Sequence, residues 1–249
     1  MPIRGVLFDV DDTLFDSGSE ADSVLAYLRM QGMLDRFPDG AAALGLWREL
    51  KERHYARFLN GELTFAAQQR ERARELLARI GASAQGGPSD REAAAWFAGY
   101  QAHRHASRAP FPDAEPALRA LAPGFRLGVV SNSAAGHQRR KLEAIGLLAY
   151  FGDRLVCSEQ HGAAKPAASI FLAGCAALGL PPHEVAYVGD QYETDALGAR
   201  RAGLRGFWLD RAGGGSAADA GIGVVHSLED LRATLATPDP KARLEHERS

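Results

Sequence analysis

Residues 3–14 read IRGVLFDVDDTL, a short apolar run that ends in a cluster of acidic residues. A continuous run of Val, Leu and Phe of this length is typical of a strand that is buried on both faces of a parallel sheet. In such sheets ligands bind beyond the carboxyl ends of the strands. The acidic residues therefore stand at the position where a binding site is expected.

The same pattern recurs further along the chain. Three later apolar runs end in polar residues: 125–130 before Ser131, 185–188 before Asp190, and 206–209 before Asp210. Helical patterns lie between them at 135–145, 167–178 and 194–202, and the last two are followed by Gly179 and Gly203, as helix ends commonly are. Alternating strands and helices predict an α/β fold with a Rossmann-like, doubly wound parallel sheet.

One long segment breaks this alternation. Between residues 17 and 108 we find no buried strand, but four amphipathic helical patterns at 21–34, 41–59, 65–80 and 91–105, separated by turn-forming clusters. We therefore predict a core domain made of residues 1–16 and 109–236 and an inserted helical cap domain at 17–108. The residues from 237 to 249 contain few apolar side chains, and we expect a flexible tail there.

The composition limits the class of protein. The chain has 249 residues, of which 46% are hydrophobic and 24% charged, so it is neither disordered nor fibrous. Lys and Arg number 29 against 31 Asp and Glu, which argues against nucleic acid as a partner. No run approaches the roughly 18 apolar residues of a membrane span, and the first residues do not resemble a secretory signal. We expect a cytoplasmic protein without a membrane partner, in which Cys157 and Cys175 are buried and reduced.

Several polar residues follow the predicted strands or precede the predicted helices: Asp9, Asp11, Asp12, Thr13, Ser131, Asn132, Lys165, Asp190 and Asp195. Carboxylates that converge on one point raise each other's pKa, and a divalent cation relieves this repulsion. Oxygen ligands without His or Cys favour Mg²⁺ over zinc. A carboxylate can also act as a nucleophile, and a second one can transfer protons. A lysine and a hydroxyl can hold phosphoryl oxygens, so the set suits phosphoryl transfer.

Four segments of the chain, in this order, resemble the motifs of the haloacid dehalogenase (HAD) superfamily, in the phosphatase-like branch with a helical cap. They are LFDVDDTL at 7–14, VVSNS at 129–133, AKP at 164–166 and VGDQYETD at 188–195. The resemblance implies Asp9 as nucleophile and Mg²⁺ ligand, and Asp11 as general acid and base whose backbone carbonyl also binds the metal. It further implies phosphate binding by Ser131, Asn132 and Lys165, charge compensation by Lys165, metal binding by Asp190, and supporting roles for Thr13 and Asp195.

The resemblance also implies a reaction. HAD dehalogenases lack an acid two residues after the nucleophile, so Asp11 favours a phosphatase that forms an aspartyl-phosphate on a small soluble phosphomonoester, of sugar phosphate or nucleotide type. Asp12 stands where many capped phosphatases carry Gly. A phosphomutase with the same intermediate and a non-catalytic binding module remain alternatives, and the protein is expected to be a monomer or homodimer. We interpret Arg139, Arg140 and Lys141 as a solvated helix face.

Overall fold

In the computed structural model the chain folds into two compact units. Met1–Asp16 and Ala109–Ser249 form the first, the core unit, and Ser17–Arg108 form the second, the helical unit. The structure describes residues 2–16, 18, 20–82, 87–105, 109–215 and 221–236. The tail predicted at 237–249 lies outside these residues. Within the described part of the chain, no helix is both long and apolar enough to cross a bilayer.

The core unit is built on one parallel sheet of six strands in the order β3-β2-β1-β4-β5-β6. The strands are β1 Gly5–Phe8, β2 Arg126–Ser131, β3 Leu155–Cys157, β4 Val185–Gly189, β5 Arg205–Leu209 and β6 Gly223–Val225. In this order the direction of winding reverses between β1 and β4, which is where doubly wound sheets form their ligand crevice. The predicted fold class is confirmed.

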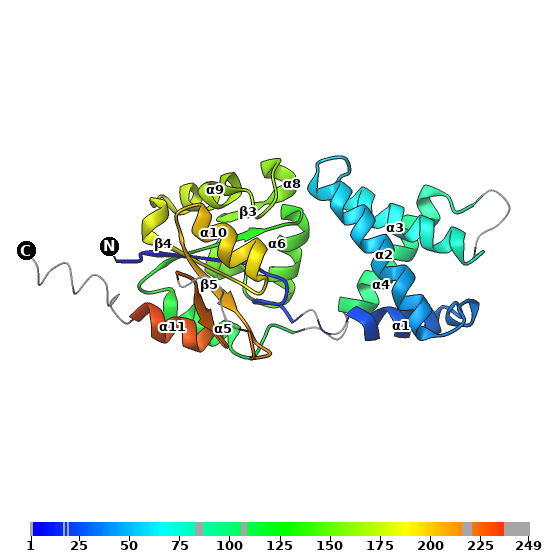
Figure 1. Ribbon diagram of the computed structural model, residues 1–249, viewed down its shortest axis with the longest axis horizontal. Coiled ribbons are helices and arrows are strands. Elements are labelled where there is room, and N and C mark those ends of the chain that lie inside the picture. The colour runs from blue at the N-terminus through cyan, green and yellow to red at the C-terminus, as the bar shows by residue number, and fades with distance from the viewer. Residues whose placement is uncertain are drawn as a thin grey trace, which may run out of the picture. The chain divides into compact units, whose positions relative to one another are not determined.

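Helices cover both faces of this sheet. The helical segments of the core unit are α5 Ala114–Leu121, α6 Ala135–Ala144, α7 Leu148–Phe151, α8 Ser158–His161, α9 Ala168–Leu178, the short turn Pro182–Glu184, a π-helix at Tyr192–Leu197, α10 Gly198–Arg201 and α11 Leu228–Ala236. Val6 and Phe8 of β1 pack against α5, α6, α7 and α11, whereas Leu7 packs against α9 on the other face. Figure 1 shows α9 and α10 on one side of the sheet and α5 and α11 on the other.

Two details of the core unit differ from the prediction. The edge strands β3 and β6, three residues each, were not expected. The helix predicted at 194–202 is instead a π-helix followed by α10. Gly179 and Gly203 do follow helices, and their φ angles of +62° and +90° are the left-handed values that glycine adopts readily. Cys157 and Cys175 are both buried and free, as expected.

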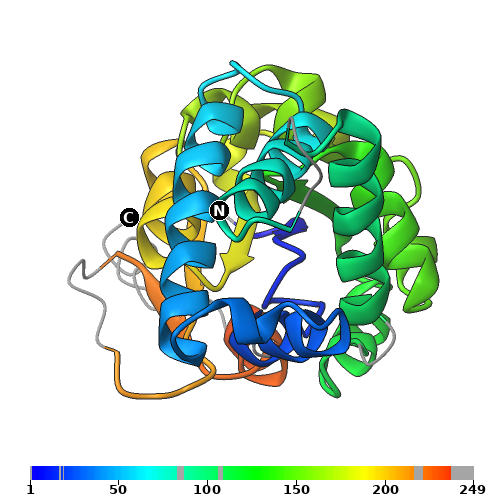
Figure 2. The same ribbon diagram turned by 90° about the vertical axis from the view of Figure 1, so that its right-hand side faces the viewer.

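The helical unit consists of α1 Glu20–Met30, a short turn at Leu34–Arg36, α2 Gly40–Leu59, α3 Phe65–Arg79 and α4 Asp90–His105. The side chains of Asp39 and Thr64 cap α2 and α3 by accepting hydrogen bonds from backbone N–H groups at 2.7 and 3.1 Å. Helix α3 contacts both α2 and α4, and α1 contacts the same two helices (Figure 2). Trp47 and Trp96 meet in the core of this unit with their ring centroids 6.1 Å apart.

The chain leaves and re-enters the core unit at neighbouring positions. The N–H of Asp16 donates to the carbonyl of Ala109 at 3.2 Å, and the N–H of Phe111 donates to the carbonyl of Leu14 at 3.1 Å. Residues 14–16 and 109–111 therefore run side by side where they join the insert to the core. This pair of connecting segments follows directly on the acidic residues at the end of β1.

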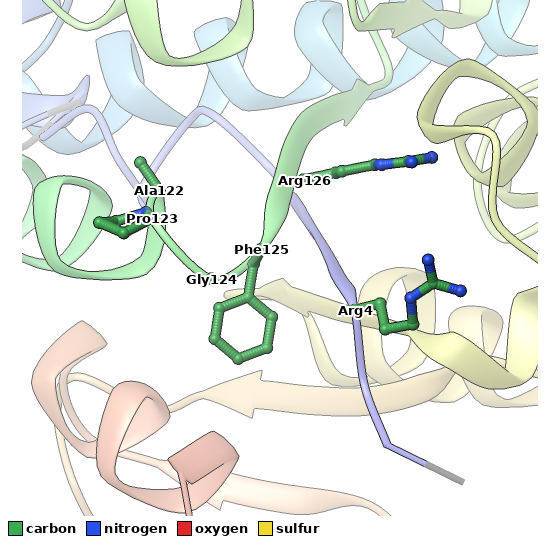
Figure 3. A pocket seen from close by; sticks show the side chains of 6 residues that line it. All are labelled: Arg4, Ala122, Pro123, Gly124, Phe125 and Arg126. Atoms are coloured by element: carbon green, nitrogen blue, oxygen red, sulfur yellow. The ribbon is translucent and has the colours of Figure 1, made fainter.

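A hollow of about 280 Å³ opens at the amino-terminal ends of β1 and β2, whereas the acidic residues follow the carboxyl end of β1 (Figure 3). It is lined by Arg4, Ala122, Pro123, Gly124, Phe125 and Arg126. Both arginines are engaged with the protein itself: Arg4 pairs with Glu184 at 2.9 Å, and Arg126 donates to the carbonyl of Leu178 at 2.7 Å. None of the predicted site residues lines this hollow, so it is separate from the candidate active site.

Candidate active site

Three neighbouring strands bring the predicted site residues together. Asp9 follows β1, Ser131 ends β2 and Asp190 follows β4, and these strands lie side by side in the sheet. The N–H of Asp9 extends the sheet ladder by donating to the carbonyl of Val188 at 2.9 Å. Because parallel strands end at the same edge, residues far apart in sequence converge at the point where the winding reverses.

Lys165 lies at the centre of the site, at the carboxyl ends of these strands. Its side chain is almost completely buried, and its Nζ lies 2.6 Å from Asp9 Oδ1 and 2.7 Å from Asp195 Oδ1. The side-chain amide of Asn132 holds the backbone of Lys165 from both sides: its Nδ2 donates to the Lys165 carbonyl at 3.0 Å, and its Oδ1 accepts from the Lys165 N–H at 2.7 Å. Asn132 thus fixes the place from which Lys165 reaches the carboxylates.

Tyr187 completes this network, and the sequence analysis did not identify it. The residue is buried in β4, and its hydroxyl accepts from Lys165 Nζ at 2.8 Å. The same hydroxyl lies 3.0 Å from the carbonyl of Val130 and 3.1 Å from Asp195 Oδ1. A tyrosine inside a buried strand needs a partner for its hydroxyl, which is the one signal in the sequence that points to such a contact.

The carboxylates in this network have shifted pKa values. Burial raises the pKa of Asp9 to about 7, although the charge of Lys165 opposes the shift. Burial, with the nearby charge of Asp9, raises the pKa of Asp190 to about 8. For Lys165 burial disfavours the charged form, but the charges of Asp195 and Asp9 raise its pKa well above the ordinary value. The site therefore holds more carboxylates than its one central lysine neutralises.

This surplus of carboxylates suits a cation. Oxygen atoms of Asp9, Asp190 and Asp195 lie within 4.8 Å of one another. Asp190 Oδ1 is buried and has no hydrogen-bond partner among the described residues. Gly189 allows this approach, because a Cβ at its position would overlap the carboxylate of Asp195. An all-oxygen donor set with an unpartnered buried oxygen fits Mg²⁺, which takes one or two carboxylates together with water and phosphate oxygens.

The carboxylate of Asp11 has different partners from this acidic group. Its Oδ1 forms an ion pair with Lys141 Nζ, and its Oδ2 accepts from Gln138 Nε2 at 2.9 Å. Gln138 Nε2 also donates to Ser131 Oγ at 2.9 Å. Partial burial by itself would raise the pKa of Asp11, but the charge and hydrogen bond of Lys141 and the hydrogen bond of Gln138 lower it below the ordinary range. Asp9 and Asp11 are thus two residues apart and electrostatically distinct.

Lys141 corrects an expectation from the sequence. The run 139–141 was interpreted as a solvated helix face, and Arg139 and Arg140 are indeed exposed. The side chain of Lys141 is buried against Asp11 instead. Because Gln138 precedes it by three residues on α6, both side chains lie on the same face of the helix, toward the site.

The loop after β1 turns back on itself at Thr13. The N–H groups of Leu14 and Phe15 both donate to the carbonyl of Val10, at 3.0 and 2.9 Å. Thr13 is fully buried; its hydroxyl has no hydrogen-bond partner in the described part of the chain, and its carbonyl accepts from Arg211 at 2.9 Å. Asp12 has a φ of +59°, the left-handed conformation that Asp tolerates better than most residues.

The parallel sheet, which winds in both directions from β1 and β4, and the acidic group at the carboxyl ends of its strands are the features of an α/β enzyme with a doubly wound core. The family model described as "Hydrolase: haloacid dehalogenase-like hydrolase" matches residues 3–203. The chain belongs to this family of hydrolases, and the resemblance seen in the four sequence motifs is confirmed. The match extends across the helical unit and across all the site residues predicted from the sequence, from Asp9 to Asp195.

The chain is similar to several proteins whose names state an activity. The chain is 34% identical to a glyceraldehyde 3-phosphate phosphatase of Methanopyrus kandleri over 204 residues, which cover 81% of this chain and 82% of the relative. It is 31% identical to a phosphoserine phosphatase of Thermus thermophilus over 226 residues, covering 83% and 88%. Among solved structures, a 2-haloacid dehalogenase of Pseudomonas syringae is 27% identical with a TM-score of 0.70, covering 94% of this chain and 98% of that one.

Proposed function

We propose that this protein is a Mg²⁺-dependent phosphatase that hydrolyses a small phosphomonoester through an aspartyl-phosphate on Asp9. The observation that supports this proposal is the different surroundings of the two aspartates after β1. Asp9 belongs to an acidic group that suits a cation and pairs with Lys165, whereas the carboxylate of Asp11 is bound by Lys141 and Gln138. One carboxylate is thus arranged for nucleophilic attack and the other for proton transfer.

In the first step a carboxylate oxygen of Asp9 attacks phosphorus, and the bond from phosphorus to the ester oxygen breaks. The negative charge of the bound phosphoryl group raises the pKa of Asp11, which then carries a proton and donates it to that oxygen, so that the oxygen leaves as an alcohol. Lys165 and the hydroxyl of Ser131 bind the phosphoryl oxygens, and Asn132 keeps Lys165 in place. Asp9, Asp190 and the backbone carbonyl of Asp11 would hold Mg²⁺, which would supply positive charge that offsets the charge on the phosphoryl group.

In the second step water replaces the alcohol. The carboxylate of Asp11 accepts a proton from the water, whose oxygen attacks phosphorus while the bond to Asp9 breaks. Phosphate leaves, and Asp9 is again a carboxylate beside Lys165. The two steps need Asp11 first as an acid and then as a base, so the proton that it gives to the alcohol is recovered from the water.

Two of the named relatives act on small phosphate esters, which supports the substrate class. One similar solved structure is named a 2-haloacid dehalogenase, so removal of halide from a haloacid is the alternative reaction to consider. Halide leaves as a stable anion and needs no proton, whereas an alcohol does. The position of Asp11 two residues after Asp9 therefore favours a phosphate ester over a haloacid. Thr13 and Asp195 support the site, through the loop after β1 and through Lys165 respectively.

We also propose that residues 17–108 act as a cap domain that selects the leaving group. The insert begins directly after the loop that carries Asp9 and Asp11, and residues 14–16 and 109–111 join it to the core side by side. An inserted unit connected by two short adjacent segments is the usual arrangement for closing over a site and excluding bulk water.

The test is release of inorganic phosphate from a panel of sugar phosphates, nucleotides, phosphoserine and small alkyl phosphates, each with Mg²⁺ and with EDTA. We expect release with Mg²⁺ alone, and loss of at least about 10³-fold in Asp9→Asn, because no nucleophile remains. Asp153→Asn is the control, since Asp153 is an exposed aspartate of the same unit. Full activity of Asp9→Asn, or halide release from 2-haloacids without phosphate release, would overturn the proposal.

A further inference from the structure

Two buried polar side chains of α6 enter the mechanism above only as partners of Asp11, and neither takes part in a step of its own. Lys141 and Gln138 are 5% and 0% exposed, and three residues apart they share one face of the helix. A buried ammonium group is costly unless it is paired with an opposite charge. For Lys141 that charge is the carboxylate of Asp11, and its Nζ also lies 4.9 Å from the centre of the Phe15 ring.

The two side chains bind different oxygens of the same carboxylate. Lys141 pairs with Oδ1 of Asp11 and Gln138 donates to Oδ2. The side chain of Asp11 is 43% exposed and would otherwise rotate into solvent. With a donor on each oxygen, rotation of the carboxylate breaks at least one buried contact, so the orientation of Asp11 is fixed from α6.

Gln138 also connects this carboxylate to the other side of the site. Its Nε2 donates to Ser131 Oγ and to Asp11 Oδ2, both at 2.9 Å. One amide group therefore sets the distance between the proposed phosphate-binding hydroxyl and the proposed acid. A role confined to folding would not require the same amide to contact both groups.

We propose that Lys141 and Gln138 are positioning residues, which hold Asp11 in the orientation that protonates the leaving oxygen while Ser131 binds the phosphoryl group. The inference rests on the proposed phosphatase activity. It states that α6, outside the four sequence motifs, determines how well the leaving alcohol is protonated. Neither side chain needs to contact the substrate.

The readout is the dependence on the leaving group. The value of kcat/KM covers the steps up to departure of the alcohol, so it reports proton donation without the later hydrolysis of the intermediate. An alkyl phosphate needs that proton, whereas 4-nitrophenyl phosphate releases a stable phenolate without it. Asp11→Asn sets the limit, with an expected loss of about 10²–10⁴-fold for the alkyl ester and much less for the aryl ester.

For Lys141→Met and for Gln138→Met we expect kcat/KM to fall by about 10- to 100-fold for the alkyl ester and by less than about threefold for the aryl ester. Lys141→Arg keeps the charge and should recover much of the alkyl activity. Arg140→Met removes the same charge from an exposed position of the same helix and is the control. Gln138→Met changes no charge and tests the proposal even where Lys141→Met does not fold.

The outcomes separate the two proposals. Equal losses for both esters mean that Lys141 and Gln138 act only on folding, and unchanged values mean that they do not position Asp11; either overturns this inference and leaves the phosphatase standing. A wild-type protein that hydrolyses neither ester overturns the proposed function, and the inference falls with it. A selective loss for the alkyl ester in both variants is the result we expect.

Discussion

Raising the pH from about 5 to about 7 in the absence of divalent cations should destabilise the core unit. Asp9 titrates at about 7 in the folded protein, against an ordinary value of 3.8 in the unfolded chain. Between these values the folded state holds one proton more than the unfolded state. The free energy of unfolding therefore falls by about 1.4 kcal/mol for each pH unit.

Over two pH units this amounts to about 3 kcal/mol for Asp9 alone. For a chain of this length 1 kcal/mol corresponds to a shift in Tm of about 2–4 °C, so we expect a decrease of about 6–12 °C. Asp190, with a pKa of about 8, acts in the same direction and extends the decrease above pH 7. Mg²⁺ should reverse the trend, because it binds the ionised carboxylates of the folded state.

The assay is thermal unfolding followed by circular dichroism at pH 5, 6, 7 and 8 with EDTA, then with Mg²⁺. The double variant Asp9→Asn, Asp190→Asn removes both titrations and should show a nearly flat dependence of Tm on pH. Asp153→Asn, an exposed aspartate, should retain the wild-type slope. Parallel curves for the wild type and the double variant would refute the reasoning, since the slope would then come from other groups.

Lys165→Met should lower the free energy of unfolding by about 3–5 kcal/mol, because it leaves two buried carboxylates without their cation; urea denaturation at neutral pH measures this, and a loss below about 1 kcal/mol would contradict it. Tyr187→Phe should cost about 1–3 kcal/mol, since it leaves a buried carbonyl without its hydroxyl partner; an unchanged urea midpoint would argue against that contact. At Asp12 the φ of +59° predicts that Ala is less stable than Gly by about 1 kcal/mol. Both replacements remove the same charge, so equal stabilities would exclude a left-handed backbone there.

The sequence predicts the centre of the sheet better than its edges. Strands β1, β2, β4 and β5 contain continuous apolar residues that are buried on both faces, and such runs are recognisable without any partner. The edge strands LVC and GVV have three residues each and are only partly buried. A segment this short has no periodicity, and it becomes a strand only because a neighbouring strand offers it hydrogen bonds.

The proximity of Asp9, Ser131 and Asp190 was predictable for a physical reason. Each stands at the end of a buried parallel strand, and the ends of such strands lie at one edge. Their roles in the reaction stay predictions. Lys165 and Asp195 were candidates because each stands at the start of a predicted helix and within a matching motif, but nothing in their local sequence distinguishes a buried ion pair from an exposed one.

The contacts of α6 could not be predicted from local pattern. Lys141 and Asp11 are separated by 130 positions in the chain, and an isolated helix with the run GHQRRKLEA has too little apolar surface to indicate a buried face. The helix turns polar side chains toward the loop after β1, so the rule that charged faces are solvated fails there. Tyr187 was missed for a related reason, since its hydroxyl partners come from separate segments.

The pairing of residues 14–16 with residues 109–111 bears on how such enzymes diversify. The segments that enter and leave the insert are joined to each other by backbone hydrogen bonds, and these bonds do not depend on which residues lie between the two segments. An insertion, deletion or exchange within residues 17–108 leaves the register of the sheet unaltered, provided that the ends of the new segment lie equally close. Selection can then act on the insert and on the six strands separately, so that a change of substrate need not disturb the residues that react with it.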